Sequence, residues 1–274
     1  MTTATTDQLP LVVDSIPPTP QDSGQPPQPL EGAHVLLVHG FASTPMVNWH
    51  HTRWVSQLQA QGATVHTVTL PYHRLPESAE ETPGAVSYQL PATQRLLSAI
   101  AESLASYLAT LSGEVHLVGY SIGARICWTL ASLYPDAVSS LVAGAMPLTN
   151  HVPLINRALR TGGRLPDGFA DILTGSPVPE PQLQAFAALP IESFSSSPLP
   201  ACPVLFFRGN QDTVARDSFK AYKFLAPDQA VWLEYPRRDH INILTSGKLR
   251  ATAIEFMVRH RPTPASGVSQ HTVA

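Results

Sequence analysis

The sequence predicts an α/β fold, with a mostly parallel central sheet covered by helices on both faces. Three observations lead to this prediction. Short runs of apolar residues recur along the chain, as expected of strands that are buried on both faces. Stretches whose apolar residues follow three- and four-residue spacing, as in amphipathic helices, lie between these runs. Strands that alternate with helices in this way are typical of parallel sheets.

Length and composition limit the classes of protein to be considered. A chain of 274 residues can bury one substantial core, and 43% of its residues are hydrophobic. The formal net charge is −3 and no dense basic run is present, so nucleic acid is not an expected partner. The two cysteines, Cys127 and Cys202, make no disulfide framework, and no Cys/His spacing suggests a metal site. We therefore expect neither a metal nor a cofactor.

The sequence also lacks the signals of export and membrane insertion. No positive region followed by an apolar one opens the chain, and no stretch approaches about 18 uninterrupted apolar residues. We therefore expect a cytoplasmic protein without a membrane span. The sequence favours no particular oligomeric state.

The chain ends differ in composition from the part between them. Residues 1–31 are rich in Thr, Gln and Pro, and we expect a disordered or extended arm there because such a segment buries little apolar surface. The globular domain should cover residues 32–262, and residues 263–274 should form a tail. The alternative for the arm is that it packs on the domain through its few apolar residues, which are Leu9, Leu11, Val12 and Val13.

The first half of the domain begins with an apolar run at 35–38, which predicts a buried strand. A helix is expected at 50–61, and alternating β-branched residues predict a strand at 64–70. The segment from 71 to 91 is rich in Pro and has no clear period, so we expect a loop that is long enough to shape a site. An amphipathic helix over 92–111 follows this loop.

The second half continues the alternation with one interruption. We expect strands at 115–119, 141–146, 203–207 and 230–235, and helices at 124–133 and 247–260. The interval between the second and third of these strands breaks the pattern and contains short helical pieces separated by Gly and Pro. We expect a small helical lid there, over about 147–202, with helical pieces at 154–159, 168–173 and 182–189.

The pentapeptide Gly119-Tyr120-Ser121-Ile122-Gly123 lies between an expected strand and an expected helix. A Gly-x-Ser-x-Gly pattern in this setting is typical of a nucleophile elbow, in which the serine Oγ projects above the edge of the sheet. The two glycines let the strand and the helix approach without clashes between Cβ atoms. Ser121 is therefore the candidate nucleophile.

A carboxylate follows later in the chain, directly after the apolar run at 203–207. From this place Asp212 can accept from Nδ1–H of a histidine, fix its tautomer and stabilise the imidazolium. Two other acids compete for this role. Asp217 lies inside an expected helix and should behave like a surface residue, and Asp239 stands too close to the candidate histidine in sequence to face it easily. We therefore favour Asp212 as the acid.

The candidate base is His240, which follows the strand expected at 230–235. The other histidine between Asp212 and the C-terminal tail, His260, lies late in the last expected helix, where its interaction with the helix dipole is the simpler interpretation. Ser121, Asp212 and His240 thus occur in the chain order Ser…Asp…His.

This order and the local motifs resemble those of the α/β-hydrolase superfamily over roughly residues 33–260. The chain looks closest to bacterial serine hydrolases with an elbow of the type GYSxGAR and a histidine in the context Arg-Asp-His, here Arg238-Asp239-His240. The stretch His39-Gly40-Phe41-Ala42-Ser43, with Asn48-Trp49 after it, is similar to that group too. These relatives usually carry an Arg-Gly-His-Gly-like turn where this chain reads Leu70-Pro71-Tyr72-His73-Arg74, so the loop should have a different shape.

The resemblance implies an α/β-hydrolase fold and an oxyanion hole built from the backbone N–H groups of Phe41 and Ile122. It also implies a substrate pocket. Phe41, Met146 and the lid are candidates for the acyl side. Tyr72 and His73 are candidates for the rim, with a plain surface loop as the alternative, and His39 is a candidate site residue that we expect to orient the oxyanion loop.

The resulting hypothesis is a serine hydrolase that cleaves a small-molecule carboxylic ester or thioester through an acyl-enzyme. The same three residues also serve carbon–carbon bond hydrolases and lyases, which are the first alternative. The second alternative is a hydrolase fold that binds a ligand without catalysis.

Overall fold

The computed structural model describes residues 9–75, 88 and 90–262. Seven strands form one sheet in the order β1-β3-β2-β4-β5-β6-β7, in which β1 runs antiparallel to β3 and the other neighbours are parallel. The strands are β1 Val12–Ile16, β2 His34–Val38, β3 Thr64–Thr69, β4 Val115–Tyr120, β5 Ser140–Gly144, β6 Val204–Gly209 and β7 Ala230–Tyr235. The α/β fold expected from the sequence is confirmed.

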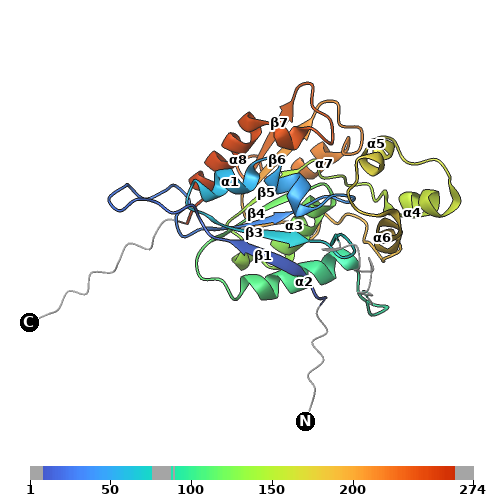
Figure 1. Ribbon diagram of the computed structural model, residues 1–274, viewed down its shortest axis with the longest axis horizontal. Coiled ribbons are helices and arrows are strands. Elements are labelled where there is room, and N and C mark those ends of the chain that lie inside the picture. Colours follow the sequence, from blue (N-terminus) through green and yellow to red (C-terminus); the bar gives the residue numbers. More distant parts are fainter. Residues whose placement is uncertain (1–8, 76–87, 89, 263–274) are drawn as a thin grey trace, which may run out of the picture.

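Helices cover both faces of this sheet (Figure 1). The α-helices are α1 Trp54–Gln59, α2 Leu96–Leu108, α3 Ile122–Leu133, α4 Val152–Thr161, α5 Phe169–Thr174, α6 Glu180–Ala187, α7 Ser218–Tyr222 and α8 Gly247–Arg259. A π-helical turn, Met46–His50, and two 3₁₀ turns, Pro135–Ala137 and Ile243–Thr245, complete the described secondary structure.

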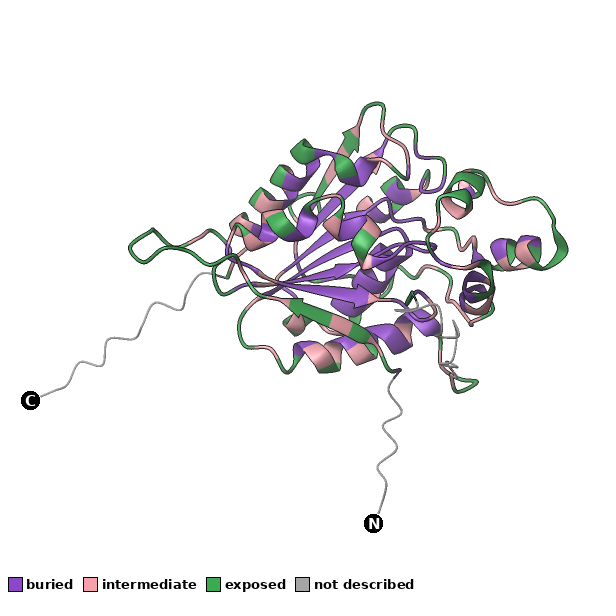
Figure 2. Ribbon diagram, viewed as in Figure 1, coloured by how far each residue is buried: buried purple, intermediate pink, exposed green. Residues whose placement is uncertain are grey.

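Alternation along the central strands divides the core into two layers. On β2, Leu36 and Val38 face the layer that contains α2, α3 and α7, whereas Val35 and Leu37 face the layer that contains α1 and α8. The strands β2, β4 and β5 are almost wholly buried, as Figure 2 shows by their purple colour. This two-sided burial explains why their sequences are continuous apolar runs.

The expected boundary of the domain at residue 32 is wrong, because the chain joins the sheet earlier. Residues 12–16 form β1 and pair antiparallel with β3 over five positions, from Val12 opposite Thr69 to Ile16 opposite Val65. Leu9 and Leu30 are both buried in the core. The few apolar residues of this segment therefore pack on the domain, and its proline content only limits the length of the strand. Residues 1–8 and the expected tail at 263–274 lie outside the described residues.

Two helices are shorter than their sequence patterns. The helix expected at 50–61 is confined to α1, because Arg53 just before it adopts a left-handed conformation with φ 65°. The helix expected at 92–111 begins only at Leu96, after Arg95 in an extended conformation. Much of the loop expected at 71–91 lies outside the described residues.

The interval between β5 and β6 forms the expected lid of short helices. It contains α4, α5 and α6, which lie together beyond one end of the strands (Figure 1). Because β4, β5 and β6 are parallel, the residues that follow each of them emerge beneath this lid. In the described part of the chain no helix is long and apolar enough to cross a membrane.

Candidate active site

Ser121 lies at the sharp turn between β4 and α3, with φ 56° and ψ −119°. This conformation is strained for a residue with a side chain, and it projects Oγ away from the sheet. The turn is possible because Gly119 and Gly123, two positions before and after Ser121, have no Cβ. A Cβ on Gly123 would lie 2.2 Å from the carbonyl oxygen of Val38, and one on Gly119 would lie 2.5 Å from Cα of Ala124.

The structure brings Ser121, His240 and Asp212 together in one chain of hydrogen bonds. Nε2 of His240 lies 3.1 Å from Ser121 Oγ, and Nδ1 lies 2.8 Å from Asp212 Oδ2. The acid is buried, with 3% of its surface exposed. A carboxylate there requires the proton of the neutral imidazole to be on Nδ1, which leaves a lone pair on Nε2 for the serine hydroxyl.

Backbone amides fix the orientation of the Asp212 carboxylate. Oδ1 accepts from the amides of Val214 and Ala215, each at 2.9 Å, while Oδ2 is left for the histidine. Each oxygen of the carboxylate therefore has its own partner. These amides belong to the turn that follows β6, so the acid and the groups that orient it come from one short segment.

Tyr120 and Asp239 hold the loop that carries His240. The Tyr120 hydroxyl donates to the carbonyl oxygen of His240, and the two rings lie 5.2 Å apart. Burial, and then the charges of Asp212 and Asp239, raise the pKa of Tyr120 well above its usual value, so it remains a donor. Asp239 Oδ1 accepts from the amides of Ile241 and Asn242, both at 2.8 Å, and its role is local to this loop.

The two other sequence candidates lie elsewhere. His260 follows α8, where its Nδ1 bonds to the carbonyl oxygen of Phe256. Asp217 is a half-buried anchor for the start of the lid, which corrects the expectation of a surface residue. Its carboxylate accepts from the amides of Leu148 and Thr149 and from the Thr149 hydroxyl. Burial favours a higher pKa for Asp217, but these hydrogen bonds outweigh it and lower the pKa.

The loop after β2 places the amide of Phe41 near the serine. On either side of it, Gly40 N donates to Asn48 Oδ1 at 3.0 Å and Ala42 N donates to His73 Nε2 at 3.1 Å. Among the described residues, no hydrogen bond uses the amide of Phe41. Ile122 is the first residue of α3, so its amide belongs to the helix N-terminus, where backbone N–H groups have no partner within the helix.

His39, in the loop after β2, and His73, in the loop after β3, each accept a hydrogen bond from a backbone amide of the other loop. His39 Nδ1 donates to the Gly40 carbonyl at 2.8 Å, and Nε2 accepts from the amide of Leu70 at 3.1 Å. Burial lowers the pKa of His39 to about 3 and that of His73 to about 4, so both are neutral and can accept at Nε2. His39 is completely buried and lines neither of the two described cavities beside the serine, and both of its ring nitrogens bind backbone groups.

Two cavities flank Ser121 beneath the lid. The first contains His240 and extends to α5. Its lining residues are Gly40, Phe41, Ala42, Ser43, Asn48, Tyr120, Ser121, Asp171, Ile172, Gly175, His240 and Ile241. The second lies on the side of α3 and α4. Its lining residues are Phe41, Ser121, Ile122, Arg125, Pro147, Thr149, Asn150, His151, Val152, Ile155 and Phe169. Each cavity thus offers one side of the serine to a substrate.

Two expected pocket residues do not line these cavities. Met146 is fully buried in the core, and its carbonyl accepts from the Ser218 hydroxyl at 2.8 Å. The Tyr72 hydroxyl accepts from the amide of Tyr88 at 3.1 Å, so it fastens one part of the loop after β3 to another. Both corrections have the same cause. Proximity in sequence to a strand end did not reveal which way the side chain turns.

Sequence reasoning missed Asn48 and Tyr120 as parts of this site, and it offered His73 only as a rim residue. Tyr120 and Asn48 stood inside the motifs that carried the family resemblance, which is the signal that singles them out. The role of His73 depends on a contact across 31 residues, and no local pattern indicates it. Within the described residues, no group of three or more His, Cys, Asp or Glu side chains could hold a metal ion.

Comparison with known proteins agrees with this architecture. A family model described as "alpha/beta hydrolase fold" matches residues 33–189. A search of curated protein sequences gives no match. Among solved structures, the esterase of Thermogutta terrifontis has a TM-score of 0.63 and 18% identity, with 95% of this chain and 97% of that chain covered.

Two further solved structures are similar to a comparable degree. The protein BpoC of Mycobacterium tuberculosis, described as a non-heme bromoperoxidase, has a TM-score of 0.65 and 16% identity and covers 93% of this chain and 98% of its own. The monoacylglycerol lipase of Paleococcus ferrophilus has a TM-score of 0.60 and 16% identity and covers 92% of this chain and 99% of its own. At these identities the likeness concerns the fold.

Proposed function

Because this chain belongs to the alpha/beta hydrolase fold family, we propose that it is a serine hydrolase that cleaves a carboxylic ester through an acyl-enzyme. The observation that carries this proposal is the hydrogen-bonded chain from Ser121 through His240 to Asp212. A nucleophile, a base and an acid that orients the base are the parts that acyl transfer needs.

In the proposed reaction, His240 Nε2 takes the proton of Ser121 as Oγ attacks the ester carbonyl. The charge that develops on the carbonyl oxygen is stabilised by the amides of Phe41 and Ile122, each worth about 3–4 kcal/mol if it resembles donors measured in other enzymes. The imidazolium then donates its proton to the leaving alcohol. Water activated by His240 attacks the acyl-enzyme in the same way and releases the acid.

The cavities favour a small substrate. Their volumes are about 80 and 20 Å³, so we expect a short acyl group and a small alcohol. We assign the cavity that contains His240 to the leaving group, because the imidazolium must reach the departing oxygen. The cavity beside α4 would then hold the acyl group. A thioester of similar size would meet the same groups.

The neighbours with solved structures support an acyl-transfer reaction in a general way. Two are described as an esterase and a monoacylglycerol lipase, and a third as a non-heme bromoperoxidase. Carbon–carbon bond hydrolysis and lyase chemistry could use the same three residues, and a ligand-binding protein would use none of them for reaction. These alternatives are distinguished by experiment.

The test is hydrolysis of p-nitrophenyl esters from acetate to octanoate, compared with acyl thioesters of the same chain lengths. We expect turnover of the shorter esters and its loss in Ser121→Ala, while the control Ser56→Ala, on the exposed face of α1, keeps full activity. A fluorophosphonate probe should label Ser121, as located by mass spectrometry. Labelling without ester or thioester turnover would favour the carbon–carbon bond alternative. Absence of both in folded protein would refute the proposal.

A further inference from the structure

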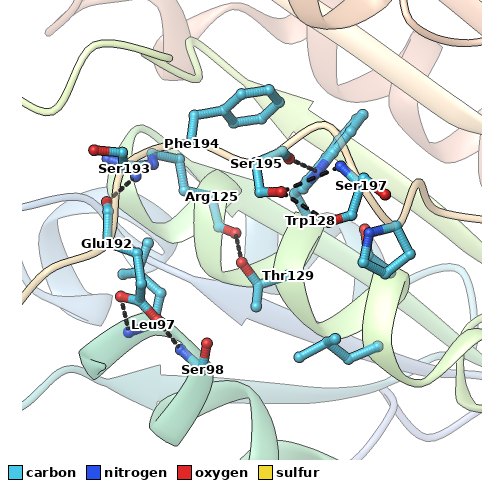
Figure 3. A pocket seen from close by; sticks show the side chains of 13 residues that line it. Leu97, Ser98, Arg125, Trp128, Thr129, Glu192, Ser193, Phe194, Ser195 and Ser197 are labelled. Carbon is cyan, nitrogen blue, oxygen red and sulfur yellow. Dashed lines mark hydrogen bonds between the residues drawn. The ribbon is translucent and has the colours of Figure 1, made fainter. Parts of the chain in front are cut away.

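A separate cavity lies on the outer side of α3, away from the reacting serine (Figure 3). Its walls are the first turn of α2, the length of α3 and the segment 192–198, which leads from the lid to β6. Neither Ser121 nor His240 lines it. The cavity has an open mouth and a volume of about 180 Å³, which limits its occupant to a small organic molecule.

Hydrogen bonds hold the segment 192–198 in place and keep this cavity formed. The Glu192 carboxylate accepts from the amides of Leu97 and Ser98 at 2.8 and 2.7 Å, and so caps α2. Arg125 Nη2 donates to the Glu192 carbonyl, and Trp128 Nε1 donates to the Ser195 carbonyl. Figure 3 shows these residues around the cavity, with α2 on one side and the segment on the other.

The lining combines an apolar surface with buried donors. Trp128 and Phe194 pack together with ring centroids 5.5 Å apart, and Leu97 and Leu133 extend this surface. The polar part comprises several hydroxyl groups, the carboxylate of Glu192 and the guanidinium of Arg125, a residue with only 3% of its surface exposed. Sites for small molecules in proteins usually combine an apolar surface with polar groups that fix the orientation of the ligand.

The guanidinium of Arg125 lacks a counter-ion. Its one hydrogen bond among the described residues goes to a backbone carbonyl, and no carboxylate of that part of the chain lies within 4.0 Å of it. Nε has no partner, and neither has the buried hydroxyl of Ser132, which lines the same cavity. Burial lowers the pKa of Arg125 to about 10, so the group is charged at neutral pH. Buried charges in proteins are normally paired.

The electrostatics of the cavity favour an anion over a cation. The nearest carboxylate, that of Glu192, already receives two amide hydrogen bonds and the positive end of α2, which offset its charge. The charges of Glu192 and Asp217 act on Arg125 and favour its charged form, but neither carboxylate forms a direct ion pair with the guanidinium. An acceptor that carries a full negative charge would therefore supply the partner that the guanidinium lacks.

We propose that this cavity is a second binding site that takes a small monocarboxylic acid with an aromatic or branched aliphatic body. The carboxylate binds Arg125, and the apolar body lies against Trp128 and Leu97. Such an acid belongs to the class of product that ester hydrolysis releases. The binding site itself does not depend on the proposed function, because no reacting group lines it.

Benzoate is the probe for calorimetric titration of the whole chain, and neutral benzamide is its matched comparison. We expect benzoate to bind at least about tenfold more tightly than benzamide, as charge-assisted hydrogen bonds usually do relative to neutral ones. Arg125→Gln should remove this preference, whereas Arg160→Gln, at an exposed position of α4, should keep it. Equal binding of the two probes, or no binding of benzoate, would overturn the proposal.

Two further measurements locate the ligand, since Arg125 also borders the cavity beside Ser121. Thr129→Met should fill the outer cavity and weaken benzoate binding, and it removes only a hydrogen bond within α3, to the Arg125 carbonyl. A diazirine-substituted benzoate should cross-link to residues 125–133 or 192–198. Cross-links confined to residues 39–43 or to His240, with unchanged affinity in Thr129→Met, would place the ligand in the active-site cavities and refute a second site.

Discussion

Replacement of Asp212 by asparagine is the sharpest test of the proposed catalytic arrangement, because the structure dictates how the new side chain must turn. The amides of Val214 and Ala215 hold the Oδ1 position, and only an oxygen can accept from them. The asparagine oxygen therefore takes that position. Its NH₂ group then occupies the place of Oδ2, 2.8 Å from Nδ1 of His240.

An NH₂ group at this place reverses the hydrogen bond to the histidine. It donates to Nδ1, so the neutral imidazole must carry its proton on Nε2, which points at Ser121 Oγ. The nitrogen that should accept the serine proton then has no lone pair to offer. The size of the effect follows from triads in which this exchange has been made. We expect kcat to fall about 10⁴-fold, equivalent to about 5.5 kcal/mol, with KM little changed.

The assay is steady-state hydrolysis of one good p-nitrophenyl ester, after circular dichroism has established that each variant is folded. The matched control is Asp239→Asn, where the two backbone amides can still bind Oδ1 and only the bond from Asn242 Nδ2 to Oδ2 is lost. A loss of about tenfold is expected there, as for groups that support a catalytic residue. If Asp212→Asn keeps activity within about tenfold of the unmodified chain and Asp239→Asn is the crippled variant, the assignment of the acid is wrong.

Three further predictions concern the frame of the site. Since His39 and His73 have pKa values of about 3 and about 4 against 6.5 unfolded, the unfolded state binds more protons, and the free energy of unfolding should fall between about pH 6.5 and 4. Urea titrations at several pH values would show this fall. An equally steep dependence of the free energy of unfolding on pH in His73→Gln would contradict the prediction. Gly123→Ala should lower the thermal midpoint and activity sharply, since its Cβ would lie 2.2 Å from a carbonyl oxygen, whereas Gly247→Ala, with 3.7 Å to the nearest atom, should not. Val13→Asp should lower the midpoint more than Val12→Asp, because Val13 packs on the core and Val12 is 41% exposed; equal effects would contradict this packing of β1.

The parts of the fold that were predictable are those with local signals. Continuous apolar runs marked β2, β4, β5 and β6 because these strands are buried on both faces, and glycines marked the turn at Ser121 because strand and helix approach closely there. The strand β1 gave no such signal. It is a short edge strand with an exposed outer side, and its place depends on pairing with β3, more than 50 residues later in the chain.

The same distinction applies to the candidate site. The three residues proposed for catalysis each follow a strand, so the parallel sheet brings them to one edge, and their places after these strands single them out in the sequence. The groups that orient these three residues were harder to predict from the sequence. Asn48 and His73 bind the loop after β2 from other elements, and Met146 was misplaced because the direction of its side chain depends on packing.

Satisfied hydrogen bonds, more than charge, position the proposed oxyanion site. Within the loop after β2, the amide of Gly40 is bound by Asn48, its carbonyl by His39 and the amide of Ala42 by His73. If either histidine were charged, its Nε2 would become a donor and could no longer accept from a backbone amide. Burial keeps both neutral, and they fix the loop in an arrangement in which, among the described residues, the amide of Phe41 has no partner. A donor prepared in this way need not be reoriented when charge develops on a substrate, which is the condition under which such amides contribute most to catalysis.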